Sequence, residues 1–133
     1  MGKIGLLIAS VNIDADKEKE FNQFYNEKHL DVSLRIPGYV TGQLFQVFQD
    51  MNLSGAVTDA PPDTFYAGKT RKFITVYEVD YEEAIAGLGN SPEGAAAAKE
   101  FFEWLPYVKD LSVTFYEPIS QKKSRKASVG GAA

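Results

Sequence analysis

Cysteine is absent from this 133-residue sequence, and histidine occurs once, as His29. Without cysteine the chain can form no disulfide, zinc–thiolate site or thiol nucleophile, and such a composition suits a reducing compartment, so we expect a cytoplasmic protein. A metal site would need carboxylate ligands beside the one histidine, and no spacing of acidic residues indicates one. We therefore expect neither a metal ion nor another cofactor.

Long apolar runs are missing as well. No stretch reaches the roughly 20 apolar residues that a membrane-spanning helix needs. The N-terminus shows neither a charged leader before a long apolar run nor a small-residue cleavage site. We therefore expect no secretion and no membrane as a partner.

Several motifs with a strong mechanistic meaning do not occur. The sequence has no phosphate-binding glycine loop, no paired metal-binding histidines and no Gly-x-Ser-x-Gly elbow. The net charge of −4 divides unevenly, because residues 119–133 hold four basic residues and no acid, which leaves 10 basic and 18 acidic residues before them. This acidic body, with a charge of −8, repels phosphate backbones, so nucleic acid is not expected to bind.

Four segments have the alternation or the aromatic and β-branched content of strands, and they cover residues 3–12, 39–49, 71–79 and 111–116. Helices are expected over residues 16–34, over residues 81–88, and from Ser91 onward, where Ser91 has the N-cap position and Pro92 the first helical position. A long connection spans residues 50–70. This order predicts the α+β class and a ferredoxin-like βαββαβ fold with a four-stranded antiparallel sheet.

The first strand is apolar on both faces, with Ile4, Leu6 and Ile8 on one side and Leu7, Ala9 and Val11 on the other. Two helices can cover one face of the sheet only, so something else is expected to cover the second face. A second copy that packs sheet to sheet is the simplest cover, and it predicts a homodimer through the sheet face, as a dimeric α/β barrel. The alternative is a modestly apolar face that stays exposed. We expect residues 1–118 to form this one domain and residues 119–133 to be a disordered basic tail.

The most informative stretch is the helix predicted over residues 16–34. At 100° per residue Phe21, Phe24, Tyr25 and Val32 share one stripe, and His29 lies at its edge, one turn after Tyr25. Histidine exchanges protons near neutral pH, and a neighbouring phenol can orient it or share a proton with a substrate. His29 and Tyr25 are therefore the candidate catalytic residues. The alternative for His29 is structural, with its ring bonded to a backbone carbonyl at the helix end.

The run Phe21-x-x-Phe24-Tyr25-Asn26-Glu27-Lys28-His29, followed by Pro37-Gly38, resembles the Trp-Tyr-x-Glu-x-His…Pro-Gly signature of the EthD-like branch of the dimeric α/β-barrel superfamily. The resemblance covers about residues 3–118 by element order. Two positions depart from it: Phe24 stands where tryptophan is usual, and Asp31 where a proline commonly follows His-Leu.

The resemblance implies a cleft between sheet and helices that holds a hydrophobic, aromatic or polyketide-like compound, with Tyr25, Asn26 and His29 as cleft positions. Three further aromatic residues, Tyr66, Tyr77 and Trp104, are candidate ligand contacts, although aromatic residues at such spacings are commonly core. Tyr66 lies in the long connection, which could act as a lid.

Two functions follow from these residues. The first is a cofactor-independent enzyme in which His29 performs acid–base chemistry on a hydrophobic aromatic or polyketide-like carbonyl compound, as a cyclase, decarboxylase, isomerase or monooxygenase. The second is a non-catalytic protein that binds a hydrophobic metabolite in the same cleft. A haem-degrading role is a third possibility, in which His29 would have to ligate the iron.

Overall fold

The computed structural model describes residues 3–50 and 69–123. Most of the predicted long connection, including Tyr66, and the last ten residues of the predicted tail therefore lie outside the described residues. The end of the domain at residue 118 stays a prediction.

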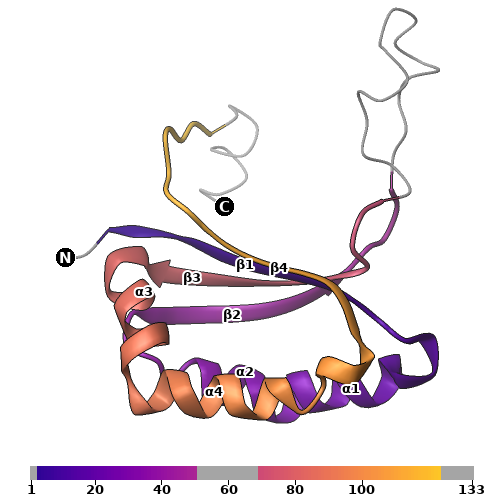
Figure 1. Cartoon of the computed structure of the whole chain (residues 1–133). Helices are drawn as coiled ribbons and strands as arrows, with labels where there is room; N and C mark the ends of the chain where they lie inside the picture. The colour runs from indigo at the N-terminus through magenta and orange to yellow at the C-terminus, as the bar shows by residue number, and fades with distance from the viewer. Residues whose placement is uncertain (1–2, 51–68, 124–133) are drawn as a thin grey trace, which may run out of the picture.

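The four predicted strands form one antiparallel sheet in the order β2-β3-β1-β4 (Figure 1). Their bounds are β1 (Ile4–Ile13), β2 (Tyr39–Gln46), β3 (Phe73–Asp80) and β4 (Val108–Tyr116). The central position of β1 explains its apolar sequence. This topology confirms the predicted ferredoxin-like plan, although β2 ends three residues earlier and β4 begins three residues earlier than expected.

The helices of the described residues lie on one side of the sheet or at its end (Figure 1). The first helical segment comprises η1 (Ala15–Lys17), α1 (Glu18–Phe24), η2 (Tyr25–His29) and α2 (Leu30–Ser33). The second comprises α3 (Tyr81–Asn90), α4 (Pro92–Phe102) and the 3₁₀ turn η3 (Leu105–Tyr107). Ser91 caps α4 as expected, because its Oγ accepts a hydrogen bond from the Gly94 N–H at 2.9 Å.

The first helical segment contains one widened turn, because η2 is a π-helix. A π-turn spans one residue more than an α-turn, so side chains four residues apart stay in line along this segment. Phe21, Tyr25, His29 and Ser33 are accordingly all buried. The sequence-based assignment of Val32 to this stripe is wrong, since the widened turn gives that place to Ser33 and leaves Val32 only half-buried.

The turn after α2 requires a glycine. Gly38 has a φ of 91°, in the left-handed region, and a Cβ there would lie 2.5 Å from the backbone nitrogen of Ala84. The Gly38 carbonyl accepts a hydrogen bond from the Asp80 N–H at 2.8 Å. The Pro37-Gly38 pair therefore fixes how the first helical segment leads into β2 and lets α3 approach closely.

The core between helices and sheet is largely aromatic. Phe21 is fully buried, and its ring centroid lies 5.2–6.4 Å from those of five other aromatic rings: Phe24, Tyr25, Phe73, Phe101 and Trp104. These rings come from α1, η2, β3, α4 and the turn after α4, so one side chain joins both helical segments to the sheet.

Replacing Phe21 with alanine is expected to lower the free energy of unfolding by about 3–5 kcal/mol, because it opens a cavity among five rings. Urea denaturation followed by circular dichroism measures this loss. The matched control is Phe102→Ala, at a ring that is 58% exposed, where the change should stay under about 1 kcal/mol. Equal losses for the two variants would contradict this description of the core.

The opposite face of the sheet carries no helix within the described residues (Figure 1). Alternation along β1 places Ile4 and Leu6 on this face, and they are 40% and 39% exposed. Phe45 of β2 and Tyr116 of β4 are 41% and 50% exposed. The first strand, expected to be buried on both sides, is therefore buried on the helix side only in the single chain.

Candidate functional site

A cavity of about 340 Å³ lies between the helix-facing side of the sheet and the helices α2 and α4. Its polar lining consists of one imidazole, three phenols and one hydroxyl: His29, Tyr25, Tyr39, Tyr77 and Ser33. Its apolar lining comes from β1, the turn before β2, the two helices of the second segment, and β4: Leu7, Ala9, Ile36, Leu88, Ala97, Ala98, Phe101, Phe102, Leu111 and Val113. We call this cavity the apolar pocket.

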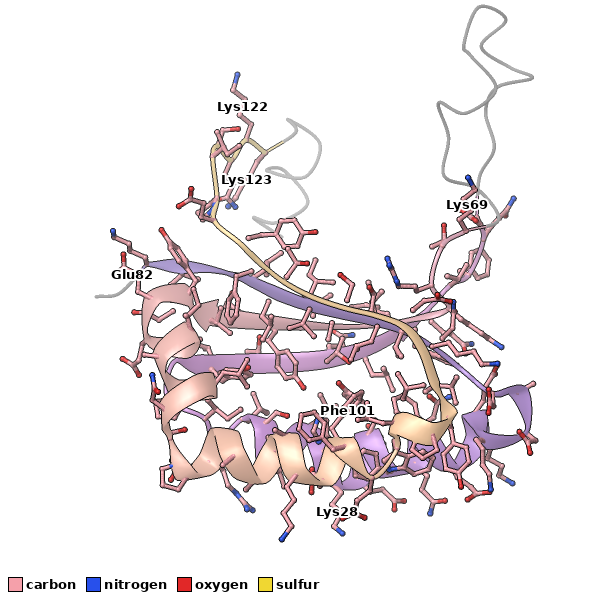
Figure 2. The ribbon with its side chains drawn as sticks, viewed as in Figure 1. Lys28, Lys69, Glu82, Phe101, Lys122 and Lys123 are labelled. Atoms are coloured by element: carbon pink, nitrogen blue, oxygen red, sulfur yellow. The ribbon has the colours of Figure 1, made fainter. Side chains whose placement is uncertain are left out.

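His29 lines the apolar pocket and is 6% exposed. Its ring stacks on Phe24, with centroids 5.3 Å apart at 26°, and meets Tyr25 edge to face at 4.8 Å. Phe101 of α4 adds a third aromatic contact at 5.6 Å, and Figure 2 shows this ring pointing from α4 toward the sheet. The imidazole is therefore held by packing on several sides.

A hydrogen bond joins His29 to the second helical segment. His29 Nδ1 lies 2.7 Å from Oε1 of Glu100, which is on α4. If His29 had the purely structural role considered above, its ring was expected to bond to a backbone carbonyl. In the structure its partner is the side-chain carboxylate of Glu100. With Nδ1 bonded to Glu100, Nε2 is the ring nitrogen that remains for a ligand in the pocket lined by His29.

Burial lowers the pKa of His29 below its ordinary value of 6.5, because the charged imidazolium is poorly solvated there. The hydrogen bond and the charge of Glu100 act in the opposite direction and offset part of this effect. The lowered pKa means that His29 is neutral at pH 7. A neutral imidazole can accept a proton, as a general base must.

This lowered pKa predicts a pH-dependent stability. As the pH falls below 6.5 the unfolded chain binds a proton at His29 before the folded chain does, so the free energy of unfolding decreases toward acid pH. The difference in unfolding free energy between wild type and His29→Gln, measured in urea from pH 7.5 to 5, isolates this contribution because other groups cancel. The wild type should lose stability relative to the variant. A difference that is constant with pH would contradict the lowered pKa.

The three phenols of the pocket stay protonated. Burial raises the pKa of Tyr25, and hydrogen bonds with Thr75 and Tyr77 offset part of the rise. Burial also raises the pKa of Tyr39 to about 12 and raises that of Tyr77, whose hydroxyl interacts with Ser33 and Tyr25. The hydroxyls of Tyr25 and Tyr39 can therefore donate hydrogen bonds to a ligand oxygen, and none of the three phenols is suited to act as a base at neutral pH.

Of the predicted site residues, the structure brings Tyr25, His29 and Tyr77 together around the apolar pocket. Trp104 is elsewhere: its ring packs on Phe21 and Phe24, with centroids 5.5 and 5.3 Å apart, and it does not line the pocket. Because Trp104 lies just after α4, its ring points toward the aromatic core and packs there.

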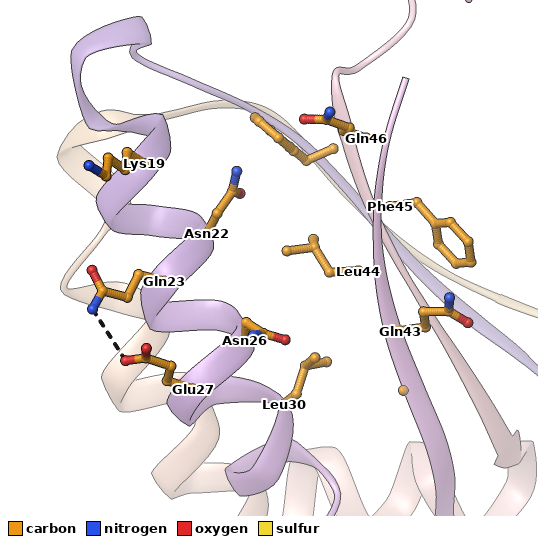
Figure 3. A pocket seen from close by; sticks show the side chains of 12 residues that line it. Lys19, Asn22, Gln23, Asn26, Glu27, Leu30, Gln43, Leu44, Phe45 and Gln46 are labelled. Carbon is orange, nitrogen blue, oxygen red and sulfur yellow. Dashed lines mark hydrogen bonds between the residues drawn. The ribbon is translucent and has the colours of Figure 1, made fainter. Parts of the chain in front are cut away.

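Asn26 is also outside the apolar pocket, because it follows Tyr25 on the helix and projects toward the edge strand β2 (Figure 3). It lines a separate groove of about 670 Å³ together with Asn22, Leu30 and Leu44. Figure 3 shows Asn22 and Asn26 pointing from the helix toward β2, while Gln23 and Glu27 bond to each other. Asn26 lines this groove only, and His29 lines the apolar pocket only.

The described residues contain neither a cluster of metal ligands nor a membrane-spanning helix. No three side chains of histidine, aspartate or glutamate in residues 3–50 and 69–123 come together in a way that could hold a metal ion. No described helix has the length and apolar content needed to cross a membrane.

The sequence matches no protein-family model and no curated protein. Its structure does match solved structures. An EthD family protein from Bacillus halodurans has a TM-score of 0.58 and 13% sequence identity, and the match covers 86% of this chain and 99% of that one. This chain has the fold of an EthD family protein. The resemblance stated from Phe21 to Gly38 is thereby confirmed at the level of the fold.

Two further structures have the same architecture. A hydroxynitrile lyase from Passiflora edulis matches with a TM-score of 0.60 and 14% identity, over 92% of this chain and 100% of that one. A dimeric ferredoxin-like protein of unknown function from Thermobifida fusca matches with a TM-score of 0.55 and 12% identity, over 89% and 93%. At identities this low, the matches establish a common fold and nothing more. Proteins with this fold include enzymes that act on small molecules, and some of the proteins are dimers.

Proposed function

We propose that the chain is a cofactor-independent enzyme in which His29 abstracts a proton from a hydrophobic aromatic or polyketide-like carbonyl compound. The observation that carries the proposal is an imidazole at the wall of an apolar pocket, bonded to Glu100 through Nδ1 and beside phenols that line the same pocket. Burial lowers the pKa of His29 and raises that of Tyr25, which favours a neutral base beside a protonated donor. A base and a set of hydrogen-bond donors facing one cavity are the two groups that enolisation needs.

In the proposed step, Nε2 of His29 takes the proton from a carbon next to the substrate carbonyl. The electron pair of that C–H bond moves to form the enolate, whose negative oxygen accepts a hydrogen bond from Tyr25, the phenol that itself accepts one from Tyr77. Reprotonation at another atom would complete an isomerisation, and attack of the enolate on a second carbonyl would complete a cyclisation. Proton abstraction is the step that these outcomes share.

The substrate is expected to be neutral and hydrophobic. No lysine, arginine, aspartate or glutamate is among the described residues that line the apolar pocket. An anionic ligand would lose its hydration there without gaining a counter-charge, which disfavours its binding.

Filling the pocket tests whether it is the binding site. Ala98 lines the pocket from α4, whereas Ala96 is exposed on the same helix. We expect Ala98→Phe to weaken binding of the neutral bicyclic ketone 2-tetralone by at least about tenfold, since the new ring occupies the ligand's volume. Titration followed by ligand-observed NMR measures the change. Ala96→Phe is the matched control, and equal effects of the two variants would place the ligand elsewhere.

Turnover separates an enzyme from the alternative, a protein that only binds a hydrophobic metabolite. Compounds that copurify with the full chain are identified by mass spectrometry and then incubated with fresh protein. The proposal predicts new products that form with the protein and not in buffer. A ligand that binds at micromolar concentration and is recovered unchanged would favour the binding protein.

We further propose that two copies associate through the open sheet face to form a homodimer, and that the protein acts in the cytoplasm. The exposed apolar residues of that face and the dimeric protein of the same fold from Thermobifida fusca support the first of these. The absence of cysteine supports the second.

A further inference from the structure

Glu100 reaches the imidazole of His29 from a different helical segment, 71 residues further along the chain. The side chains of His29 and Glu100 are 8% and 19% exposed, so water competes little with their 2.7 Å contact. In contrast to Glu100, Asp31 of α2 is exposed. The carboxylate that orients His29 therefore comes from α4.

The same contact fixes which ring nitrogen faces the pocket. Stacking on Phe24 and the edge contact with Tyr25 hold the plane of the ring, and the bond to Glu100 directs Nδ1 toward α4. A carboxylate only accepts hydrogen bonds, so a neutral His29 must carry its proton on Nδ1 to form this one. Nε2 is then unprotonated, and its lone pair is left for the pocket.

We propose that Glu100 is a positioning residue, which holds His29 in the tautomer whose Nε2 can accept a proton from a ligand in the apolar pocket. This inference rests on the proposed function, because the tautomer matters only if His29 is a base. When Nε2 takes up the substrate proton, the resulting imidazolium is paired with the carboxylate at 2.7 Å, which stabilises the charge that the reaction creates.

The groups around His29 leave few other candidates for this role. Within residues 3–50 and 69–123, Glu100 is the one charged group that acts on the pKa of His29, and the phenol of Tyr25 contacts the ring from its own helix. Lys28 precedes His29 but is exposed, and Figure 2 shows its side chain pointing away from the sheet. Glu103 is exposed at the end of α4. Glu103 therefore supplies a matched control on the same helix.

The experiment uses the uniformly ¹⁵N-labelled full chain without a histidine tag. Because His29 is the only histidine, its two ring nitrogens are observed without interference in long-range ¹H–¹⁵N correlation spectra. In the wild type at pH 8, Nδ1 is expected to be protonated and Nε2 not. Glu100→Leu, which has similar size and no acceptor, should lose this preference and show mixed tautomers. Glu100→Gln, which removes the charge, should lower the pKa of His29 further, and Glu103→Gln should match the wild type.

A wild-type spectrum with the proton on Nε2, or an unchanged tautomer in Glu100→Leu, would overturn the proposal. If Glu100→Leu does not fold, an unchanged pKa of His29 in Glu100→Gln overturns it instead. With a turnover assay, Glu100→Leu should lower kcat, by up to about 10⁴-fold where the wrong tautomer prevails, with little change in KM. The NMR result needs no substrate. An inactive His29→Gln with an unaltered tautomer in Glu100→Leu would thus reject the positioning role alone. An active His29→Gln would reject the proposed function, and the positioning role with it, whatever tautomer the NMR spectra show.

Discussion

Replacing His29 with glutamine is expected to lower kcat for the protein's own substrate by about 100- to 10,000-fold, the range that a positioned general base contributes. Glutamine fills a similar space and can still form a hydrogen bond with Glu100, but it cannot take up a proton. The loss should therefore fall on kcat and leave KM within a few-fold of the wild type. Steady-state kinetics on a substrate identified by the turnover experiment measures both constants.

The control for this variant is Lys28→Gln, at the neighbouring exposed residue, where both constants should stay at their wild-type values. Far-ultraviolet circular dichroism verifies that both variants keep the fold. His29→Gln with full activity would show that His29 is structural and that the chemistry lies with another group.

A second large effect is expected on the open sheet face. Leu6 is 39% exposed and lies on the central strand β1, so a lysine there would place a charge in the middle of the proposed sheet-to-sheet interface. In a two-fold dimer one substitution enters the interface twice, and each unpaired charge costs several kcal/mol when it is buried. We expect Leu6→Lys to weaken dimerisation by at least about 100-fold, at 1.4 kcal/mol for each factor of ten.

Sedimentation velocity at micromolar concentration measures this shift from dimer to monomer. Ile85→Lys is the matched control, because Ile85 is an apolar side chain on α3, 53% exposed and away from the open face. It should remain dimeric like the wild type. A wild-type protein that sediments as a monomer, or a Leu6→Lys variant as dimeric as Ile85→Lys, would contradict the proposed interface.

Much of the fold can be predicted from the sequence because its signals are local. The apolar run of β1, the alternation along β3, the Ser91-Pro92 helix start and the Pro37-Gly38 turn each depend on residues close in sequence, and together they give the element order. The π-turn at Tyr25–His29 could not be predicted in this way, because a hydrophobic period of 3.6 residues gives no sign of a turn with one extra residue. A regular 3.6-residue period therefore places Val32 on the buried stripe, whereas the π-turn places Ser33 there.

The site is less predictable, because its contacts join distant segments. His29 and Tyr25 could be found from their four-residue spacing, but Glu100 meets His29 only through the packing of α4 against the first helical segment. Tyr39 joins the pocket because the turn at Gly38 directs the start of β2 toward Tyr77, with ring centroids 5.1 Å apart. Trp104 is the opposite case: the sequence suggests a ligand contact, but the packing of the folded chain places its ring in the core.

Hydrogen exchange in D₂O tests the central claim, proton abstraction by His29, most directly and without knowledge of the full reaction. The probe is 2-tetralone at a concentration that saturates the apolar pocket, and NMR follows deuterium incorporation at the carbon next to its carbonyl. The wild type should accelerate this exchange above the rate in buffer, and His29→Gln, which binds the ketone equally well, should not. Exchange at the buffer rate with the wild type, or equally fast exchange with His29→Gln, would contradict the account.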